Sequence, residues 1–204
     1  RFCVLIAPNK ATVYPDKLPS TVVFSGAEGN LSRLQAALAA RNVAYVDAAA
    51  LLKDERKVRP VYHATDTHWN VCGAFVTAQA LLAAQTDILL DAPSFDREAP
   101  LLGDLARLCM PALSVSETAA AADLPTRYTA ESRIRSMSDM RIVVSGGGEA
   151  VRMVLYHDSF GEALFPYLAN ALERLVYLRG YRVDHGRPGR QIPDASANRV
   201  PRLL

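Results

Sequence analysis

The chain opens on a continuous apolar run, Phe2-Cys3-Val4-Leu5-Ile6-Ala7, which Pro8 ends. A short apolar run of this kind predicts a strand that is buried on both faces. A second run, Val43-Ala44-Tyr45-Val46, predicts another buried strand, and the segment between the two has helical periodicity. Strand, helix and strand in this order predict an α/β fold in which helices cover a mainly parallel sheet.

The rest of the chain continues the alternation of helices and strands. Helices are predicted at 30–42, with Asn30 as N-cap and Leu31, Leu34 and Leu38 on one face, and at 69–85, 100–109 and 159–173. Strands are predicted at 22–24, 141–144, 151–156 and 175–178. Residues 114–140 have no clear period. The segment Ser145–Ala150 contains three consecutive glycines and predicts a turn, because a phosphate loop would need a Lys and a following helix.

Length and composition are those of one soluble domain with a core of its own. The chain has 204 residues, of which 50% are hydrophobic and 22% charged, and its formal net charge is +2. Acidic and basic residues are interleaved along the chain, whereas a nucleic-acid partner would require clustered Lys and Arg, so no nucleic-acid partner is predicted. The three cysteines, Cys3, Cys72 and Cys109, form neither a disulfide framework nor a zinc pattern. No apolar run reaches the roughly 18 residues of a membrane span.

The two ends of the chain differ from its middle. The first residue is Arg1, without a Met and next to a strand-like run, so we interpret the sequence as an N-terminally incomplete domain. From Asp184 the chain is polar, contains Gly and Pro and lacks periodicity. We therefore expect a domain at 1–183 and a poorly ordered tail at 184–204.

Two short segments carry residues that are suited to catalysis. His157-Asp158-Ser159-Phe160-Gly161 lies between a predicted strand and a predicted helix, at the sheet edge where α/β folds bind ligands. The helix N-terminus would offer N–H groups to an oxyanion formed beside Ser159. A serine hydroxyl needs a base within hydrogen-bond distance before it is an effective nucleophile.

Thr65-Asp66-Thr67-His68-Trp69-Asn70 supplies such a base. An Asp two positions before a His can accept a hydrogen bond from one imidazole nitrogen, which leaves the other nitrogen to take the serine proton. Catalytic triads are recognised by geometry and not by chain order. The sequence thus predicts Ser159 as nucleophile, His68 as base and Asp66 as the residue that orients the base.

Each of these residues also has a structural interpretation. Ser159, Asp66, Thr67 or Asp158 could cap a helix, and His68 could be an interior histidine. Trp69 is interpreted as a core residue. The histidines and carboxylates form a further candidate set for zinc or iron, although no pair has the helical spacing of a compact metal motif. The members of that set are His63, Asp66, His68, His157 and Asp158.

Four motifs in this order resemble the alginate O-acetyltransferase family, the SGNH-hydrolase-like domains of bacterial exopolysaccharide acetylation. They are Ile6-Ala7-Pro8-Asn9-Lys10 with Val13-Tyr14-Pro15, Thr65–Asn70 with Gly73-Ala74, Gly103-Asp104-Leu105, and His157–Gly161. The resemblance covers about residues 2–183. The upstream segment of that family and its final apolar strand have no counterpart here.

The resemblance implies a three-layer SGNH-hydrolase-like fold that is circularly permuted, so that the nucleophile comes late in the chain. It implies an acetyl-serine intermediate on Ser159, with Asp66 and His68 completing the triad, and no cofactor or metal. The implied partners are a polysaccharide acceptor and a membrane-bound O-acyltransferase that supplies acetyl groups. The implied location is the periplasm, with an inner-membrane anchor in the missing N-terminal segment.

Two other functions remain open from the sequence. An esterase would use the same triad with water in place of the sugar, and a polysaccharide-binding module would retain the fold without turnover. Tyr14 and Trp69 are candidate substrate-binding residues, although packing explains either one equally well.

Overall fold

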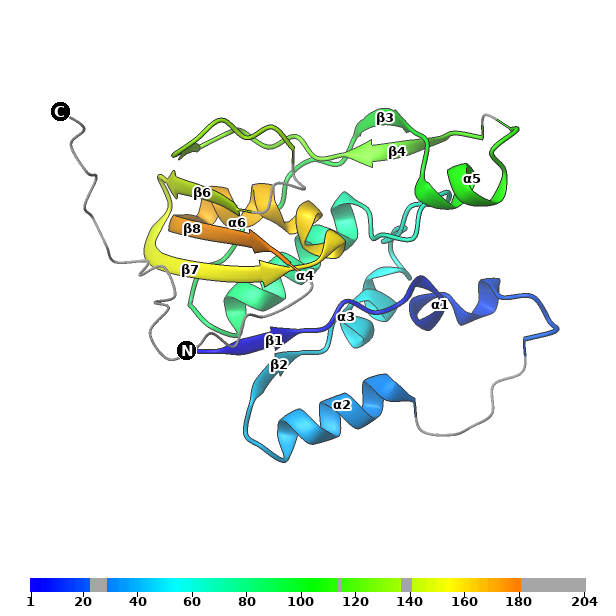
Figure 1. Cartoon of the computed structure of the whole chain (residues 1–204), viewed down its shortest axis with the longest axis horizontal. Coiled ribbons are helices and arrows are strands. Elements are labelled where there is room, and N and C mark those ends of the chain that lie inside the picture. Colours follow the sequence, from blue (N-terminus) through cyan, green and yellow to red (C-terminus); the bar gives the residue numbers. More distant parts are fainter. Residues whose placement is uncertain (23–28, 114, 137–140, 181–204) are drawn as a thin grey trace. The chain divides into compact units, whose positions relative to one another are not determined.

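The computed structural model describes residues 1–22, 29–113, 115–136 and 141–180. The chain divides into two compact units, Arg1–Pro125 and Thr126–Leu204, and each unit is described by itself. Figure 1 shows the elements of both units along the chain. The predicted tail at 184–204 and residues 23–24 of the strand predicted at 22–24 lie outside the described residues.

The first unit begins with the predicted strand–helix–strand motif. Strand β1 (Cys3–Leu5) pairs in parallel with β2 (Ala44–Val46), and helix α2 (Asn30–Ala39) lies between them in sequence. Two short helices, α1 (Lys10–Val13) and the 3₁₀ helix η1 (Pro15–Lys17), follow β1. The β1 side chains are half-buried, so the prediction that both faces of this strand are buried was wrong. Gly29 is the N-cap of α2, and Asn30 is its first residue.

Helices α3 (Ala48–Glu55) and α4 (Val71–Ala83) pack against each other in the first unit. Each begins at an N-cap residue, Asp47 or Asn70, whose side chain binds backbone N–H groups of the first turn, as is typical of Asp and Asn at this position. The Asp47 carboxylate accepts a hydrogen bond from the Ala50 N–H, and the Asn70 side chain accepts bonds from Cys72 and Gly73. The helix predicted at 69–85 is therefore confirmed, with its start set at the Asn70 cap. Core side chains of this unit include Leu52, Val61, Trp69, Ala74, Ala78 and Leu82.

Strand β3 (Arg97–Leu101) pairs antiparallel with β4 (Glu117–Ala121), and the short helix α5 (Asp104–Cys109) lies between them in sequence. The helix predicted at 100–109 was wrong at its start, because Pro100 and Leu101 belong to β3. A proline is tolerated there because β3 has a paired strand on one side only among the described residues. Strand β4 falls within 114–140, where the sequence predicted no element, because its Ala-rich segment lacks the residues typical of strands.

The second unit is a four-stranded sheet with one helix packed against it. The order is β5 (Tyr128–Ala130), β6 (Arg141–Gly146), β8 (Leu172–Arg179) and β7 (Glu149–His157). After β7 come the 3₁₀ helix η2 (Ser159–Leu164) and α6 (Phe165–Ala171), so the single helix predicted at 159–173 is two elements and ends before Leu172. Helix α6 contacts β6 and β8 (Figure 1). The core includes Val144, Phe165, Leu168, Leu175 and Tyr177.

The glycine segment connects β6 to β7, and β8 separates these two strands in the sheet. A Cβ at Gly146 would lie 2.3 Å from the Leu172 carbonyl oxygen, and one at Gly148 would lie 2.2 Å from that of Ala171. The predicted turn is present, and two of its glycines are also required by the close approach of the chain where α6 meets β8.

The strand pairings are mixed. β1–β2 and β7–β8 are parallel, whereas β3–β4, β5–β6 and β6–β8 are antiparallel. The predicted α/β class is therefore correct, but the mainly parallel sheet is not what the described strands form. No helix in the described part of the chain combines the length and the apolar character that a membrane crossing requires.

Candidate active site

The first candidate segment is a loop, residues 63–68, held together at its base. Tyr62 and Trp69 form an antiparallel bridge across it, and the His63 N–H donates to the His68 carbonyl oxygen at 3.3 Å. Trp69 is 1% exposed, and Asn70 caps α4 directly behind it. The ends of the loop are thus fixed by the bridge between Tyr62 and the buried Trp69 and by the start of α4.

Asp66 and His68 form a short hydrogen bond within this loop. Asp66 Oδ1 lies 2.6 Å from His68 Nδ1 and also accepts from the His68 backbone N–H at 2.9 Å. Because an ionised carboxylate only accepts hydrogen bonds, Nδ1 must donate, and the neutral imidazole carries its lone pair on Nε2. This is the tautomer that a general base in a triad needs.

The charge on Asp66 is stabilised by backbone groups. Burial raises the pKa of Asp66, but hydrogen bonds from the N–H groups of His68 and Asp104, and from the His68 ring, outweigh it and hold the pKa below the usual range. The Asp104 N–H reaches Asp66 Oδ2 at 3.0 Å. Asp66 is therefore an anion at neutral pH, as the orientation of His68 requires.

Asp104 is a second carboxylate beside the pair. Its Oδ1 accepts from the Thr67 N–H at 2.8 Å, its Oδ2 accepts from the Thr67 hydroxyl at 2.5 Å, and Oδ2 lies 3.8 Å from His68 Nδ1. The sequence placed Asp104 in a family motif without giving it a role. Here it fixes the residue between Asp66 and His68, and so the direction in which both side chains point.

Asp66, His68 and Asp104 also bring ligand atoms within 4.8 Å of one another, as a metal site would. The same carboxylate oxygens accept the hydrogen bonds described above, which hold the two carboxylates close to His68. Of the metal set predicted from the sequence, the structure groups Asp66 and His68 with Asp104 and not with His63; His157 and Asp158 belong to the second unit.

Two further charged residues hold the loop, and the sequence did not indicate a role for either. The Lys10 ammonium donates to the carbonyl oxygens of His63, Ala64 and Asp66 at 2.5, 3.0 and 3.1 Å. The Glu117 carboxylate accepts from the N–H groups of Ala64 and Thr65 at 2.7 and 2.8 Å. Only Lys10 carried a signal, since it lies in the first motif of the resemblance.

Gly103 allows the start of α5 to approach the loop. A Cβ at this position would lie 2.1 Å from the Thr65 carbonyl oxygen and 2.7 Å from the Asp66 nitrogen. Its φ of −71° is open to any residue, so close approach is the reason that glycine is needed here.

The second candidate segment surrounds Ser159 at the start of η2. Asp158 is the N-cap, and its carboxylate accepts from the Phe160 N–H at 2.9 Å. The interpretation of Asp158 as a cap is thus correct, and that of Ser159 as a cap is wrong. The Gly161 N–H donates to the Asp158 carbonyl oxygen at 3.2 Å. Two of the N–H groups expected to stabilise an oxyanion are therefore engaged with Asp158.

The His157 ring packs against this turn and against Tyr177. Its ring lies 3.7 Å from the Tyr177 ring, its Nδ1 is 2.6 Å from the Asp158 carbonyl oxygen, and the Tyr177 hydroxyl donates to the Gly161 carbonyl oxygen. Burial lowers the pKa of His157, although the hydrogen bond to Asp158 opposes the shift. A Cβ at Gly161 would lie 2.4 Å from the His157 Cβ, so the ring and the turn fit closely.

The structure brings Asp66 and His68 together in the first unit. Ser159 lies in the second unit, so its pairing with His68 stays a prediction. The Tyr14 hydroxyl accepts from the Val61 N–H at 3.1 Å, and its ring packs edge-on against Tyr62. Packing thus explains Tyr14, and burial explains Trp69; substrate contact by either residue is untested.

Residues 1–177 match the family model described as "SGNH hydrolase-like domain, acetyltransferase AlgX", and the chain belongs to this family. The resemblance noted in the sequence is confirmed. No curated protein matches the sequence.

Solved structures share the fold at low sequence identity. A DHHW family protein from Eubacterium siraeum aligns over 87% of this chain and 68% of its own, with a TM-score of 0.67 and 18% identity. The O-acetyltransferase domain of Pseudomonas putida AlgJ aligns over 88% of this chain, with a TM-score of 0.57 and 21% identity, and the matched part spans 64% of its length. Bacillus cereus PatB1 with a sulfonyl adduct gives a TM-score of 0.55 at 18% identity, over 87% of this chain and 72% of its own.

Proposed function

We propose that the protein is an O-acetyltransferase that moves acetyl groups onto hydroxyls of an alginate-like exopolysaccharide through an acetyl-serine intermediate. Membership of the AlgX family and the likeness in fold to an O-acetyltransferase domain support this class of reaction. The observation that carries the proposal is the 2.6 Å hydrogen bond from His68 Nδ1 to Asp66, because it leaves Nε2 as the basic nitrogen.

The proposed reaction has two matched steps. His68 Nε2 takes the proton of the Ser159 hydroxyl while Oγ attacks the acetyl carbonyl, and the imidazolium returns the proton to the leaving group. His68 then takes a proton from a sugar hydroxyl, whose oxygen attacks the acetyl-enzyme, and gives the proton back to Ser159. Asp66 stabilises the imidazolium in both steps. This scheme requires Ser159 and His68 to meet in the working enzyme.

The finer details of the fold belong to the same proposal. A three-layer SGNH arrangement with circular permutation would account for a nucleophile that follows the Asp and His in the chain. Among solved proteins of this fold, PatB1 carries a sulfonyl adduct, which makes a sulfonyl fluoride a suitable probe for Ser159.

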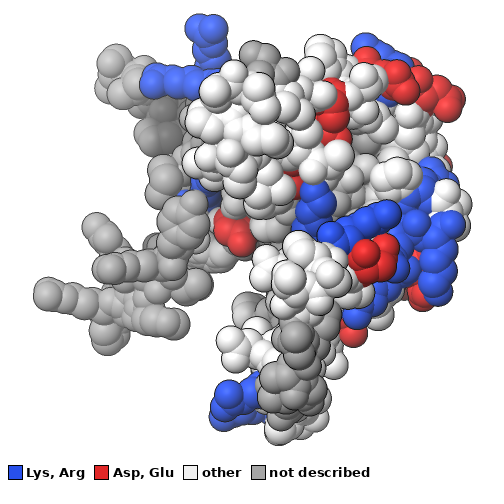
Figure 2. Space-filling model, turned by 90° about the vertical axis from the view of Figure 1, so that its right-hand side faces the viewer, with Lys and Arg blue, Asp and Glu red and all other residues white. Residues whose placement is uncertain are grey.

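The basic side chains of the molecule lie among acidic ones, so its charges neither require nor exclude an anionic acceptor. Figure 2 shows a face on which Lys and Arg side chains gather, with acidic side chains among them. In the first unit, α3 and the residues after it carry Lys53, Arg56, Lys57 and Arg59, of which the last three form ion pairs with Asp16, Asp54 and Glu55. We assign the acetyl donor to a membrane-bound O-acyltransferase and the location to the periplasm, with an anchor to the inner membrane.

The test is to incubate the full chain with a chromogenic acetyl ester, with and without an oligouronate acceptor, and to search for acetylated or sulfonylated Ser159 by mass spectrometry. An adduct on Ser159 that is lost in His68→Ala supports the triad. Ser132→Ala is the matched control, because Ser132 is an exposed serine of the same unit, and it should keep full activity.

Formation of acetylated acceptor would identify the protein as a transferase. Release of acetate at a rate that does not depend on the acceptor would identify it as an esterase. A folded protein that forms no adduct and no acetate, but binds the acceptor, would be a binding module instead. Activity that persists in Ser159→Ala would refute the proposed nucleophile.

A further inference from the structure

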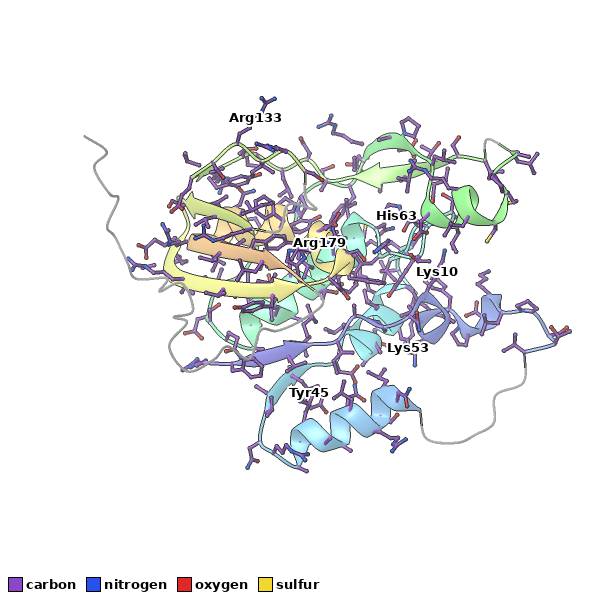
Figure 3. All side chains as sticks on the ribbon, viewed as in Figure 1. Lys10, Tyr45, Lys53, His63, Arg133 and Arg179 are labelled. Carbon is purple, nitrogen blue, oxygen red and sulfur yellow. The ribbon has the colours of Figure 1, made fainter. Side chains whose placement is uncertain are left out.

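We infer that Lys10 and Glu117 are positioning residues that act as a charge clamp on the loop bearing the Asp66–His68 pair. This inference rests on the proposed function for its kinetic consequence, but the clamp itself is a feature of the first unit alone. Lys10 comes from α1 and Glu117 from β4, more than a hundred positions apart in the chain. Figure 3 labels Lys10 and His63, which lie next to each other at the loop.

Lys10 binds the loop through all three of its donors. An ammonium group has three N–H bonds, and three carbonyl oxygens, those of His63, Ala64 and Asp66, lie within 3.1 Å of Nζ. Three carbonyl groups of one short loop can converge on a point only if the chain curls around it. The cation therefore stabilises a curled backbone that would otherwise bring carbonyl dipoles together.

The Glu117 carboxylate binds the same loop by accepting hydrogen bonds from N–H and hydroxyl groups of the loop. Oε2 accepts from the Ala64 N–H at 2.7 Å, and Oε1 accepts from the N–H and the hydroxyl of Thr65 at 2.8 and 2.7 Å. Burial raises the pKa of Glu117, but these hydrogen bonds outweigh it and lower the pKa, so the carboxylate is ionised. Ala64 is thus held by Glu117 at its N–H and by Lys10 at its carbonyl oxygen.

The clamp acts on catalysis through Asp66. Its backbone carbonyl is bound by Lys10, its side chain orients His68, and the preceding residue, Thr65, is fixed by Glu117. Neither charged group is proposed to touch substrate. Loss of either charge should let Asp66 move relative to His68, and a misplacement of about 1 Å at a reacting group costs roughly 100-fold in rate.

The experiment combines kinetics with a spectroscopic signature. The proton between His68 and Asp66 should give a downfield NMR resonance, assigned by its absence in His68→Ala. Lys10→Met and Glu117→Gln should lose or shift this resonance and lower kcat by roughly 100-fold with little change in KM. Lys17→Met is the matched control, since Lys17 is an exposed lysine of the same unit to which no role in the site is assigned, and it should change neither.

Rescue of Lys10→Ala by small cations distinguishes a role of Lys10 in positioning the loop from a role in folding. Lys10→Ala leaves a site lined by three carbonyl oxygens, so potassium or methylammonium, compared with sodium, should restore part of the resonance and of kcat. If Lys10→Met does not fold, Glu117→Gln, which keeps the shape of the side chain, gives the answer. An unchanged resonance and kcat in folded Lys10→Met and Glu117→Gln would overturn the clamp. A wild-type protein without turnover would refute the proposed function, while the resonance would still report on the clamp.

Discussion

Replacing Gly103 by Ala tests how closely the start of α5 must approach the loop. The new Cβ would lie 2.1 Å from the Thr65 carbonyl oxygen, whereas ordinary contact begins at 3.4 Å. The loop or the helix must therefore move by about 1.3 Å, the difference between the two values. Because the atoms in contact are backbone atoms of Thr65 and Asp66, no side chain can rotate away.

The expected effects follow from that displacement. Overpacking of this kind costs about 1–3 kcal/mol of stability, which for a chain of this size lowers Tm by roughly 2–4 °C per kcal/mol. A shift of about 1 Å at the Asp66–His68 pair should lower kcat by roughly 100-fold. The assay is hydrolysis of a chromogenic acetyl ester, with thermal unfolding followed by circular dichroism.

Gly29→Ala is the matched control for this substitution. Gly29 is also a helix N-cap without a side-chain cap bond, with φ −77° and ψ 165° against −71° and 168° at Gly103, and a Cβ there would meet nothing within 4 Å. Both variants share the loss of a glycine cap and of backbone freedom in the unfolded chain. Equal activity and equal Tm in the two variants would refute the reasoning.

Three further predictions concern single charged or titratable groups. Asp66→Asn should lower kcat by about ten-thousand-fold at an unchanged fold, because an amide no longer selects the Nδ1–H tautomer of His68; an activity near that of the wild type would contradict this role. The pKa of Glu117 is lowered in the folded protein, so its contribution to stability is present above about pH 4.3 and is lost as the pH falls through the lower folded value. As the pH is lowered, the Tm of Glu117→Gln should therefore decrease less than the Tm of the wild type. Burial lowers the pKa of His157, so stability should fall as the pH drops below about 6.5, and His157→Phe should flatten that part of the Tm–pH curve.

Much of the secondary structure followed from local patterns. Apolar runs located β1, β2, β6, β7 and β8, and helical spacing located α2 and α4. The errors lie where distant pairing overrides local preference. Pro100 and Leu101 form a strand because β4 lies opposite them, and the Ala-rich β4 is a strand because of β3. The helix predicted after Ser159 begins as a 3₁₀ helix with Asp158 as its N-cap.

The sequence by itself determined the Asp66–His68 pair, since two residues separated by one position can form their hydrogen bond within a single turn of the loop. The tertiary structure decided what holds that pair in place. Lys10, Asp104 and Glu117 come from three separate elements and meet at one loop. Gly103 lets the start of α5, which carries Asp104, approach this loop without a clash. No local pattern marks such a meeting, because hydrogen bonds to backbone groups depend on where the chain passes and not on which residue is there.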